Sequence, residues 1–294
     1  MATPLTADRL VAALRAEGVK VVEHPGWRGH HRNHKGPWGP VHGVMVHHTV
    51  TGPKVNGVPI CFTGYSSLPG PLCHGVIRRN GEVHLVSDGR ANHAGGGDPS
   101  VLAAVIDERY NDRPPAPHQH DGSAGAVDGN RSFYGFECEN LGDGVDPWPA
   151  AQVEAIVRAS AALSRAHGWG AKSVIGHSEW SDWKSDPKGP DNVVSMPRLR
   201  TRIADRLAHP ASWTPGTTTP KPPTPRPTED DMATPGENWS YRNAKADAAS
   251  VAAGLGHIPD AYGYLVQTHR MVTGLVAGIA ALTERVAELE ERQQ

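Results

Sequence analysis

The stretch HGVIRRNGEVHLV, residues 74–86, consists of two runs in which apolar and polar residues alternate. Asn80 and Gly81 stand between the runs, and this dipeptide favours the tight turn of a β-hairpin because both residues tolerate a left-handed backbone. The pattern therefore predicts two antiparallel strands. A hairpin within a chain of strands and helices indicates a mixed sheet rather than a purely parallel one.

Further strand and helix signals surround this hairpin. HGVMVHHTV (42–50) is apolar and β-branched, which is typical of a buried strand, and YGFECENL (134–141) indicates a second short strand. WPAAQVEAIVRASAALSRAHGW (148–169) has apolar residues at helical spacing, a proline near its start and a glycine after its end. Thr6 can cap a shorter helix that ends at Gly18. Together these signals predict an α/β fold with a mixed β-sheet flanked by helices.

A proline- and threonine-rich segment, residues 209–240, forms the strongest boundary in the chain. Eight prolines lie between Pro210 and Pro235, and the segment has almost nothing apolar to bury. Such a composition is typical of an extended, semi-rigid linker. We therefore expect a domain at 1–208, a linker at 209–240 and a smaller C-terminal region at 241–294.

The C-terminal region ends in a heptad pattern over about residues 265–292. β-Branched residues occupy the a positions and leucines the d positions, in the series Val272, Leu275, Ile279, Leu282, Val286 and Leu289. This choice favours a parallel two-stranded coiled coil and hence a homodimer. The alternative is a single amphipathic helix that docks on the same chain, and Gly274 and Gly278 weaken either helix.

Composition excludes several classes of protein. The formal charge is −2, from 29 basic and 31 acidic residues, so no basic field would attract nucleic acid. Three cysteines do not make a disulfide framework and suit a reducing cytosol. The first residues lack a secretory signal pattern, and no run of about 18 apolar residues occurs, so neither export nor insertion into a membrane is expected.

The stretch GHSEWSDWKSDP (176–187) gathers groups that suit a metal site. A catalytic zinc site has three protein ligands and one open position, and His177 and Asp186 are suitable ligands. Pro187 favours an extended backbone before it, in which Lys184 and Asp186, two residues apart, face the same way.

The third ligand must come from a distant strand, and VMVHHTV (44–50) offers His47 and His48. Adjacent strand residues face opposite sides, so only one of them reaches the site. The alternation of side chains along the strand does not show which of the two it is, because this strand is apolar on both faces. Any single histidine here would more often be structural, and the spacing alone is a weak motif.

The motifs together identify a resemblance. The chain resembles the zinc-dependent N-acetylmuramoyl-L-alanine amidases, which include phage endolysins and peptidoglycan recognition proteins, and its layout is most similar to endolysins of actinobacterial phages. The motifs that carry it occur in the family's order across about residues 40–190: VMVHHTV, CHGVIRRNGEVHLV, RANHAG, YGFECEN, the long helix and GHSEWSDWKSDP.

The resemblance implies a role for individual residues. It makes His47, His177 and Asp186 the ligands of one Zn²⁺, with Lys184 and Glu137 as catalytic residues. Glu137 would act as general base and acid, and Lys184 would stabilise the oxyanion. The plain alternatives are a salt bridge from Glu137 to an arginine such as Arg131, and a solvated side chain for Lys184.

Three further features of the expected cleft are less specific. Several relatives have a tyrosine where this chain has Cys73, which we expect to be a packed core thiol. His93 could form a polar wall that contacts substrate, or could be a hydrogen-bonded loop residue. The histidine-rich segment 28–40 could line the cleft, and we expect His48 to make hydrogen bonds in the core or behind the ligands.

The function implied is hydrolysis of the amide bond between N-acetylmuramic acid and L-alanine in peptidoglycan, as a phage endolysin made in the host cytoplasm and released to the wall by a holin. The alternative is a peptidoglycan-binding module without activity on the same fold. The complete set of ligands and catalytic residues favours the enzyme. A regulator that binds RNA polymerase fits the long linker less well.

Overall fold

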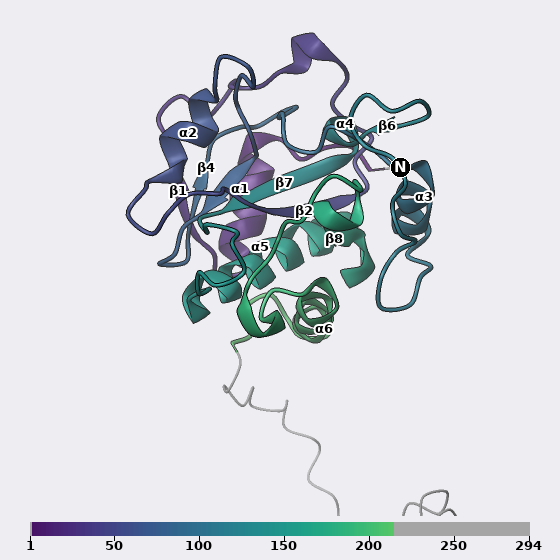
Figure 1. Ribbon diagram of the computed structural model, residues 1–294. Helices are drawn as coiled ribbons and strands as arrows, with labels where there is room; N and C mark the ends of the chain where they lie inside the picture. Colours follow the sequence, from purple (N-terminus) through teal and green to yellow (C-terminus); the bar gives the residue numbers. More distant parts are fainter. Residues whose placement is uncertain (1, 215–294) are drawn as a thin grey trace, which may run out of the picture. The chain divides into compact units, whose positions relative to one another are not determined.

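The computed structural model describes residues 2–214 (Figure 1). The coiled-coil heptads, the homodimer that they predict and most of the predicted linker lie outside these residues, so those expectations stay predictions. The domain boundaries at 208 and 240 likewise stay predictions.

A six-stranded mixed sheet is the centre of the described fold. The order of its strands is β1-β4-β3-β7-β2-β8. All neighbouring strands run parallel except β3 and β4, which run antiparallel. Their bounds are β1 Lys20–Glu23, β2 Gly43–His48, β3 Gly75–Ile77, β4 Glu82–Leu85, β7 Phe133–Cys138 and β8 Val174–Gly176. The predicted α/β class with a mixed sheet is confirmed.

The hairpin that predicted this sheet is present as β3 and β4. The Arg78 N–H donates to the Glu82 carbonyl at 2.8 Å, and Gly81 has a φ of +83°. A side chain at Gly81 would also meet the Ala151 carbonyl oxygen at 2.7 Å. The glycine is therefore required both by the turn and by the close approach of the helix beginning at residue 150.

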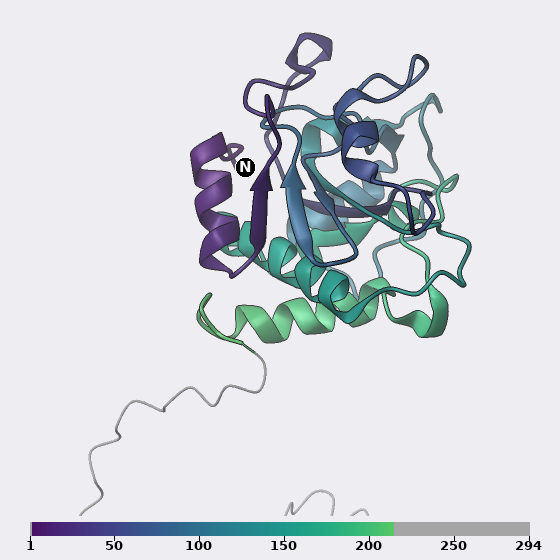
Figure 2. The same ribbon diagram turned by 90° about the vertical axis from the view of Figure 1, so that its left-hand side faces the viewer.

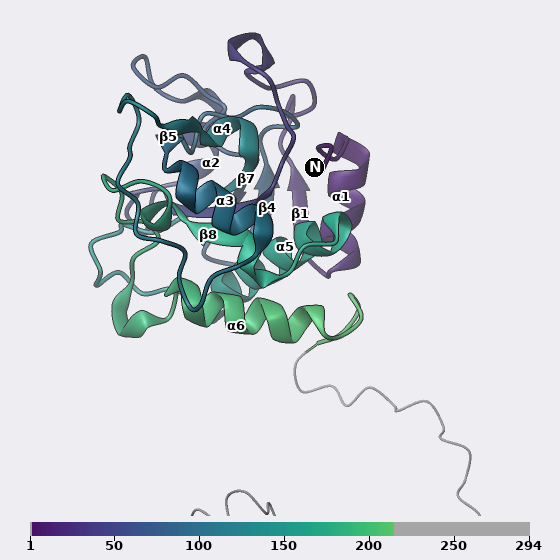
Figure 3. The same cartoon turned by 90° about the vertical axis from the view of Figure 1, so that its right-hand side faces the viewer.

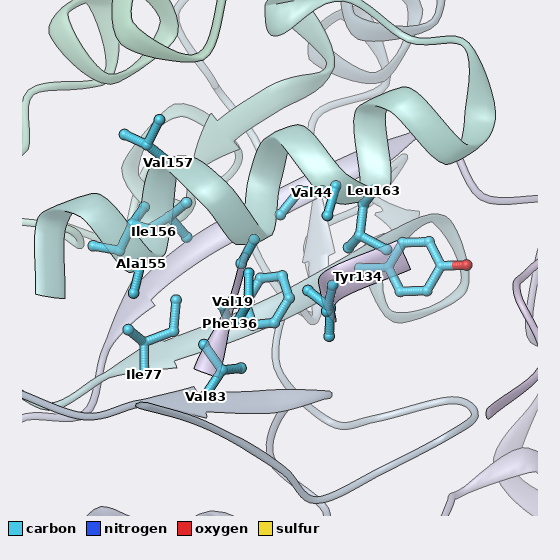
Figure 4. Packing of buried hydrophobic residues seen from close by; sticks show 14 of the residues in the cluster. Val19, Val44, Ile77, Val83, Tyr134, Phe136, Ala155, Ile156, Val157 and Leu163 are labelled. Carbon is cyan, nitrogen blue, oxygen red and sulfur yellow. The ribbon is translucent and has the colours of Figure 1, made fainter. Parts of the chain in front are cut away.

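Three helices cover one face of the sheet: α1 Ala7–Ala16, α5 Ala150–His167 and α6 Met196–Leu207. Helix α5 lies directly on the strands, with α6 beyond it (Figures 1 and 2). The apolar side chains of α5, such as Ile156 and Leu163, pack against Val44, Tyr134 and Phe136 of the sheet (Figure 4). This packing buries the apolar face that the helical spacing of 148–169 predicted.

Shorter elements cover the other face and one end of the sheet. They are α2 Gly57–Thr63, α3 Pro99–Asp107 and α4 Gly129–Ser132, and Figure 3 views the side that carries α3 and α4. A small antiparallel pair joins β5 Gly96–Gly97 to β6 Val127–Asp128, and 3₁₀ turns lie at Asn33–Lys35, Ala171–Ser173, His177–Glu179 and Pro190–Asn192. Helices α2, α3 and α6 were not expected from the sequence.

The first residues of the predicted linker pack on the domain. Arg165 donates to the carbonyl of His209, and Arg206 donates to that of Ala211. The ring of Trp213 stacks on that of His209 at 4.2 Å. Ordered structure thus continues several residues past 208. Within residues 2–214, no helix combines the length and apolar character needed to cross a membrane.

Candidate active site

One cavity of about 350 Å³ collects the residues that the sequence singled out. His47, Glu137, His177, Lys184 and Asp186 all line it. The first two lie near the carboxyl ends of β2 and β7, and His177 directly follows β8. Ligands of open α/β sheets commonly bind at this edge, where loops bring distant residues together.

The structure decides between the two histidines of β2. His47 and Met45 lie on the sheet face opposite to Val44 and Val46, which pack under α5. His48 also lines the cavity, but it does not join His177 and Asp186. Its Nδ1 instead accepts a hydrogen bond from the Lys188 N–H at 3.2 Å. The expected hydrogen-bonding role of His48 is therefore confirmed.

Three potential ligand atoms converge at the centre of the cavity. His47 Nδ1 lies 3.0 Å from His177 Nδ1 and 2.9 Å from Asp186 Oδ2, and the latter two atoms are 3.3 Å apart. Zinc bonds of about 2.0–2.1 Å at tetrahedral angles place ligand atoms about 3.3–3.4 Å apart. The triangle is thus only slightly tighter than a zinc site requires.

The outer ring nitrogens of both histidines are already engaged. His177 Nε2 lies 3.2 Å from the Ala94 carbonyl, to which it can only donate. His93 Nε2 likewise donates to the Phe133 carbonyl at 3.0 Å, so the neutral His93 ring accepts at Nδ1 from His47 Nε2, also at 3.0 Å. Neutral His47 and His177 rings therefore both direct an Nδ1 lone pair at the carboxylate.

This arrangement fits a cation. Three atoms with lone pairs face one another, and neutral rings leave no proton for the space between them. A proton on either Nδ1 would cost the hydrogen bond at the other nitrogen or create a buried imidazolium. Burial, with His177 close by, lowers the pKa of His47 to about 4, which disfavours the imidazolium. His47, His177 and Asp186 together form a group able to hold a metal ion.

Glu137 stands beside this group. It lies opposite His47 in the parallel register of β2 and β7, so the two side chains share a face. Its Oε2 is buried without a hydrogen-bond partner among the described residues. Burial, and then the Asp186 charge, raise the pKa of Glu137 to about 8, against an opposing effect of Lys184. The alternative salt bridge to Arg131 is absent, because that guanidinium donates to the Gly39 carbonyl.

A buried ion pair holds the turn that carries His177. Glu179 accepts two hydrogen bonds from Arg200 of α6, at 2.8 and 2.9 Å, and one from the Gly176 N–H at 3.3 Å. A bidentate pair of this kind fixes geometry as well as charge. The Glu179–Arg200 pair therefore joins the start of the motif 176–187 to α6, a helix that was not expected from the sequence.

His93 lines the cavity, yet both of its ring nitrogens are used within the protein. This favours a role for His93 in positioning His47 over the substrate contact expected from the sequence.

None of residues 28–40 lines the cavity. His30 instead stacks on Phe62 at 3.9 Å and hydrogen-bonds to the Val86 carbonyl.

Cys73 is fully buried in an apolar cluster with Val76 and Val86, so its expected role as a packed core thiol is confirmed. All three cysteines are free. Exposed side chains of the cavity wall, above all Trp183 and Tyr65, were missed by the sequence analysis. Lys184 is exposed and lies on the same wall as Trp183, its neighbour in the chain.

Comparison with known proteins places this site in a family. No curated protein matches the chain. A solved structure of an endolysin N-acetylmuramoyl-L-alanine amidase, LysCS from Clostridium intestinale URNW, is 16% identical, with a TM-score of 0.35, and the match covers 57% of this chain and 87% of that one. A selenomethionine derivative of AmpD is 18% identical, with a TM-score of 0.37, and the match covers 63% and 94%. The N-acetylmuramoyl-L-alanine amidase family model matches residues 37–189, just over half of the chain and every residue of the cavity named above, and the chain belongs to this family.

Proposed function

We propose that this amidase is a zinc enzyme that hydrolyses the amide bond joining N-acetylmuramic acid to L-alanine in peptidoglycan. The observation that supports zinc is the triangle of His47 Nδ1, His177 Nδ1 and Asp186 Oδ2, whose lone pairs face one another. Two imidazoles and one carboxylate are a common ligand set for catalytic zinc. When bound, zinc supplies Lewis acidity, which makes an amide carbonyl more electrophilic and a water molecule more acidic.

Glu137 is the proposed general base and acid. Its carboxyl group lines the cavity beside the ligands, and one of its oxygens has no hydrogen-bond partner among residues 2–214. A pKa raised by burial toward neutrality suits a group that must take a proton and give it back. Glu137 would remove a proton from the attacking water and deliver it to the nitrogen of the departing L-alanine.

Lys184 is the proposed oxyanion stabiliser. It lines the same cavity. Its backbone N–H donates to the Ser181 carbonyl at 3.2 Å, which closes a turn over residues 181–184. Its ammonium group would meet the negative charge that develops on the carbonyl oxygen during attack. His93 would hold His47 in the tautomer that directs Nδ1 at the metal.

The enzyme is further proposed to act as a phage endolysin, made in the host cytoplasm and released to the wall. The proline- and threonine-rich segment after the amidase domain supports a modular wall-lytic enzyme more than a compact enzyme of muropeptide recycling. Lysis of intact actinobacterial cells by added protein, after permeabilisation of the outer layers, would test this role. Activity on soluble muropeptides alone would contradict it.

The test of the catalytic proposal is hydrolysis of purified peptidoglycan, with mass spectrometry of the released peptides. Wild type should release peptides with a free L-alanine amino terminus, lose activity on chelation and regain it with zinc. Asp186→Ala should lose at least about a thousandfold in rate. Asp205→Ala on α6, whose side chain is 64% exposed, is the matched control. Cleavage that survives both chelation and Asp186→Ala would refute the assigned site.

A further inference from the structure

Exposed apolar side chains gather around the catalytic cavity. Eight large hydrophobic residues are exposed among those the structure describes, and four of them line this one cavity. The four are Val50 at 67%, Tyr65 at 54%, Leu68 at 44% and Trp183 at 67% exposed. Single exposed apolar residues need no explanation, but a group around one cavity marks a surface that binds something.

The Trp183 indole is held in place from behind. The His120 ring stacks on it with centroids 3.5 Å apart and planes 14° from parallel. His120 Nδ1 donates to Asp182 Oδ1 at 2.9 Å, and the Asp182 N–H donates to the Gln119 carbonyl at 3.2 Å. Two loops distant in sequence thus fix the ring while most of its surface stays open to solvent.

A second feature of the cavity wall is the strained backbone of Val50. Its φ is +53°, a left-handed conformation that is an outlier for a β-branched residue. Thr49 and Thr51 hold it there through a hydroxyl–hydroxyl hydrogen bond of 2.6 Å, and the Thr51 N–H donates to the Asn140 carbonyl. Strain kept at the wall of a binding cavity is typical of functional positions.

The charges of the cavity indicate which part of peptidoglycan meets this surface. Among residues 2–214, its only charged lining residues are Glu137, Lys184 and Asp186, all assigned to the reaction. The rest of the lining is aromatic, aliphatic, amide, imidazole, hydroxyl or thiol side chains and one glycine. A stem peptide bears free carboxylates and would call for additional cations. A pyranose ring is neutral, with an apolar C–H face that suits an aromatic ring and hydroxyls that suit threonine and serine.

We propose that Trp183, backed by His120, is a stacking platform for a sugar ring of the glycan strand. This rests on the proposed function, since the sugar is the part of the substrate joined through its lactyl group to the scissile amide. Trp183 is the neighbour of Lys184 and lies three residues before the ligand Asp186. A ring bound on it therefore lies beside the reacting bond, and the platform sets the affinity for the glycan.

The experiment measures binding of soluble, peptide-free oligomers of the peptidoglycan disaccharide to the zinc-loaded full chain by calorimetry. Trp183→Ala should weaken binding about tenfold, Trp183→Phe should keep most of the affinity, and His120→Ala should fall between them. Trp213→Ala is the matched control, because that indole also stacks on a histidine but does not line the cavity. Trp183→Ala should likewise raise KM on peptidoglycan about tenfold and leave kcat nearly unchanged.

Two outcomes would overturn the platform: unchanged glycan affinity in Trp183→Ala, or a fall in kcat at unchanged KM, which would mean that the residue orients Lys184 instead. Failure of the proposed function looks different. In that case glycan binding would still depend on Trp183, while wild type would release no peptide from peptidoglycan.

Discussion

Two clusters of titratable side chains differ in their charges. The triad of His47, His177 and Asp186 is buried, and so are Glu17 and Arg206 of the second cluster, to which the half-buried Arg165 is added. Only the second cluster contains charges of both signs. Glu17 Oε1 lies 2.7 Å from Arg206 Nε, and Glu17 Oε2 accepts from Arg165 Nε at 3.0 Å. These residues tie the end of α1 to α5 and α6. The triad at the other face of the sheet offers lone pairs and one negative charge, with no cation among them.

The difference separates what stabilises the fold from what serves the reaction. A buried charge with its partners in place is compatible with a stable core, whereas a buried group without them costs free energy. Glu137 repeats the contrast on a smaller scale. One of its oxygens is buried without a hydrogen-bond partner among residues 2–214, whereas each carboxylate oxygen of Glu17 has an arginine nitrogen within 3.0 Å. Substitutions in the two regions should therefore separate activity from stability.

Glu137→Gln should strongly lower activity at no cost in stability. Loss of the proposed proton carrier should lower kcat by about 10²–10⁴-fold. Because burial disfavours the charged carboxylate and raises its pKa to about 8, a neutral amide should leave the metal-free protein at least as stable at pH 7. Peptide release and thermal melting of the same preparation give the two readouts.

The opposite result for Glu137→Gln would contradict the proposed difference between the catalytic and the structural cluster. If Glu137→Gln melted well below wild type while keeping its rate, Glu137 would be a structural residue. Glu137→Asp, which keeps the charge but shortens the side chain, is the control for proton transfer.

Glu17→Ala should lower stability and leave activity unchanged. Removal of the carboxylate leaves the buried Arg206 with only the more distant Glu154, 3.8 Å away, as a counter-charge, which should lower the free energy of unfolding by about 3 kcal/mol. The activity of the folded fraction should be unchanged, because the cluster lies on the face away from the cavity. Urea unfolding and kcat at low temperature would measure the two effects, and Glu17→Gln should recover part of the loss.

The sequence predicted the sheet better than the site. The hairpin at 74–86 carried its own turn signal, so its pairing could be predicted from local residues alone. The choice between His47 and His48 could not, since helices and loops cover both faces of the sheet and leave β2 apolar on either side. Only the packing of Val44 and Val46 under α5 shows that His47, on the opposite face, is the histidine that joins His177 and Asp186.

Trp183 shows a second limit of sequence analysis. Trp180 and Trp183 stand three residues apart in one motif, yet Trp180 is fully buried and Trp183 is largely exposed. Nothing local distinguishes them, because burial is decided by Gly97 and Gly129, which leave room for the Trp180 ring. The bond between His47 and His93 spans 46 residues and is equally invisible to local spacing.

His93→Ala sharpens the comparison from within the triad. Without His93 Nδ1, His47 loses the acceptor that fixes its tautomer, and zinc affinity should fall about 10–100-fold. Competition with a chromophoric chelator measures this directly, and excess zinc should restore much of the rate. His84→Ala, in the hairpin and outside the cavity, should bind zinc as wild type does. Unchanged affinity in His93→Ala would return that residue to the substrate-contacting role.

The smallest effect is expected at His167, in the structural half of the molecule. Its Nε2 accepts from the Tyr134 hydroxyl at 3.1 Å, and that hydroxyl accepts from the Leu5 N–H at 2.7 Å. Burial, and then the Arg9 charge, lowers the pKa of His167 to about 4 from the usual 6.5.

In the unfolded chain, His167 is therefore protonated as the pH falls below about 6.5, whereas in the folded protein it is protonated only below about pH 4. Stability from this residue is complete above pH 6.5 and is lost as the pH falls through that window. The side chain is partly exposed, so solvent screening limits the loss to about 1 kcal/mol. His167→Gln keeps an acceptor but cannot be protonated, and urea unfolding at pH 7, 5.5 and 4 should show the wild-type advantage shrinking by that amount. A constant difference across the three pH values would mean that His167 titrates alike in the folded and unfolded chains.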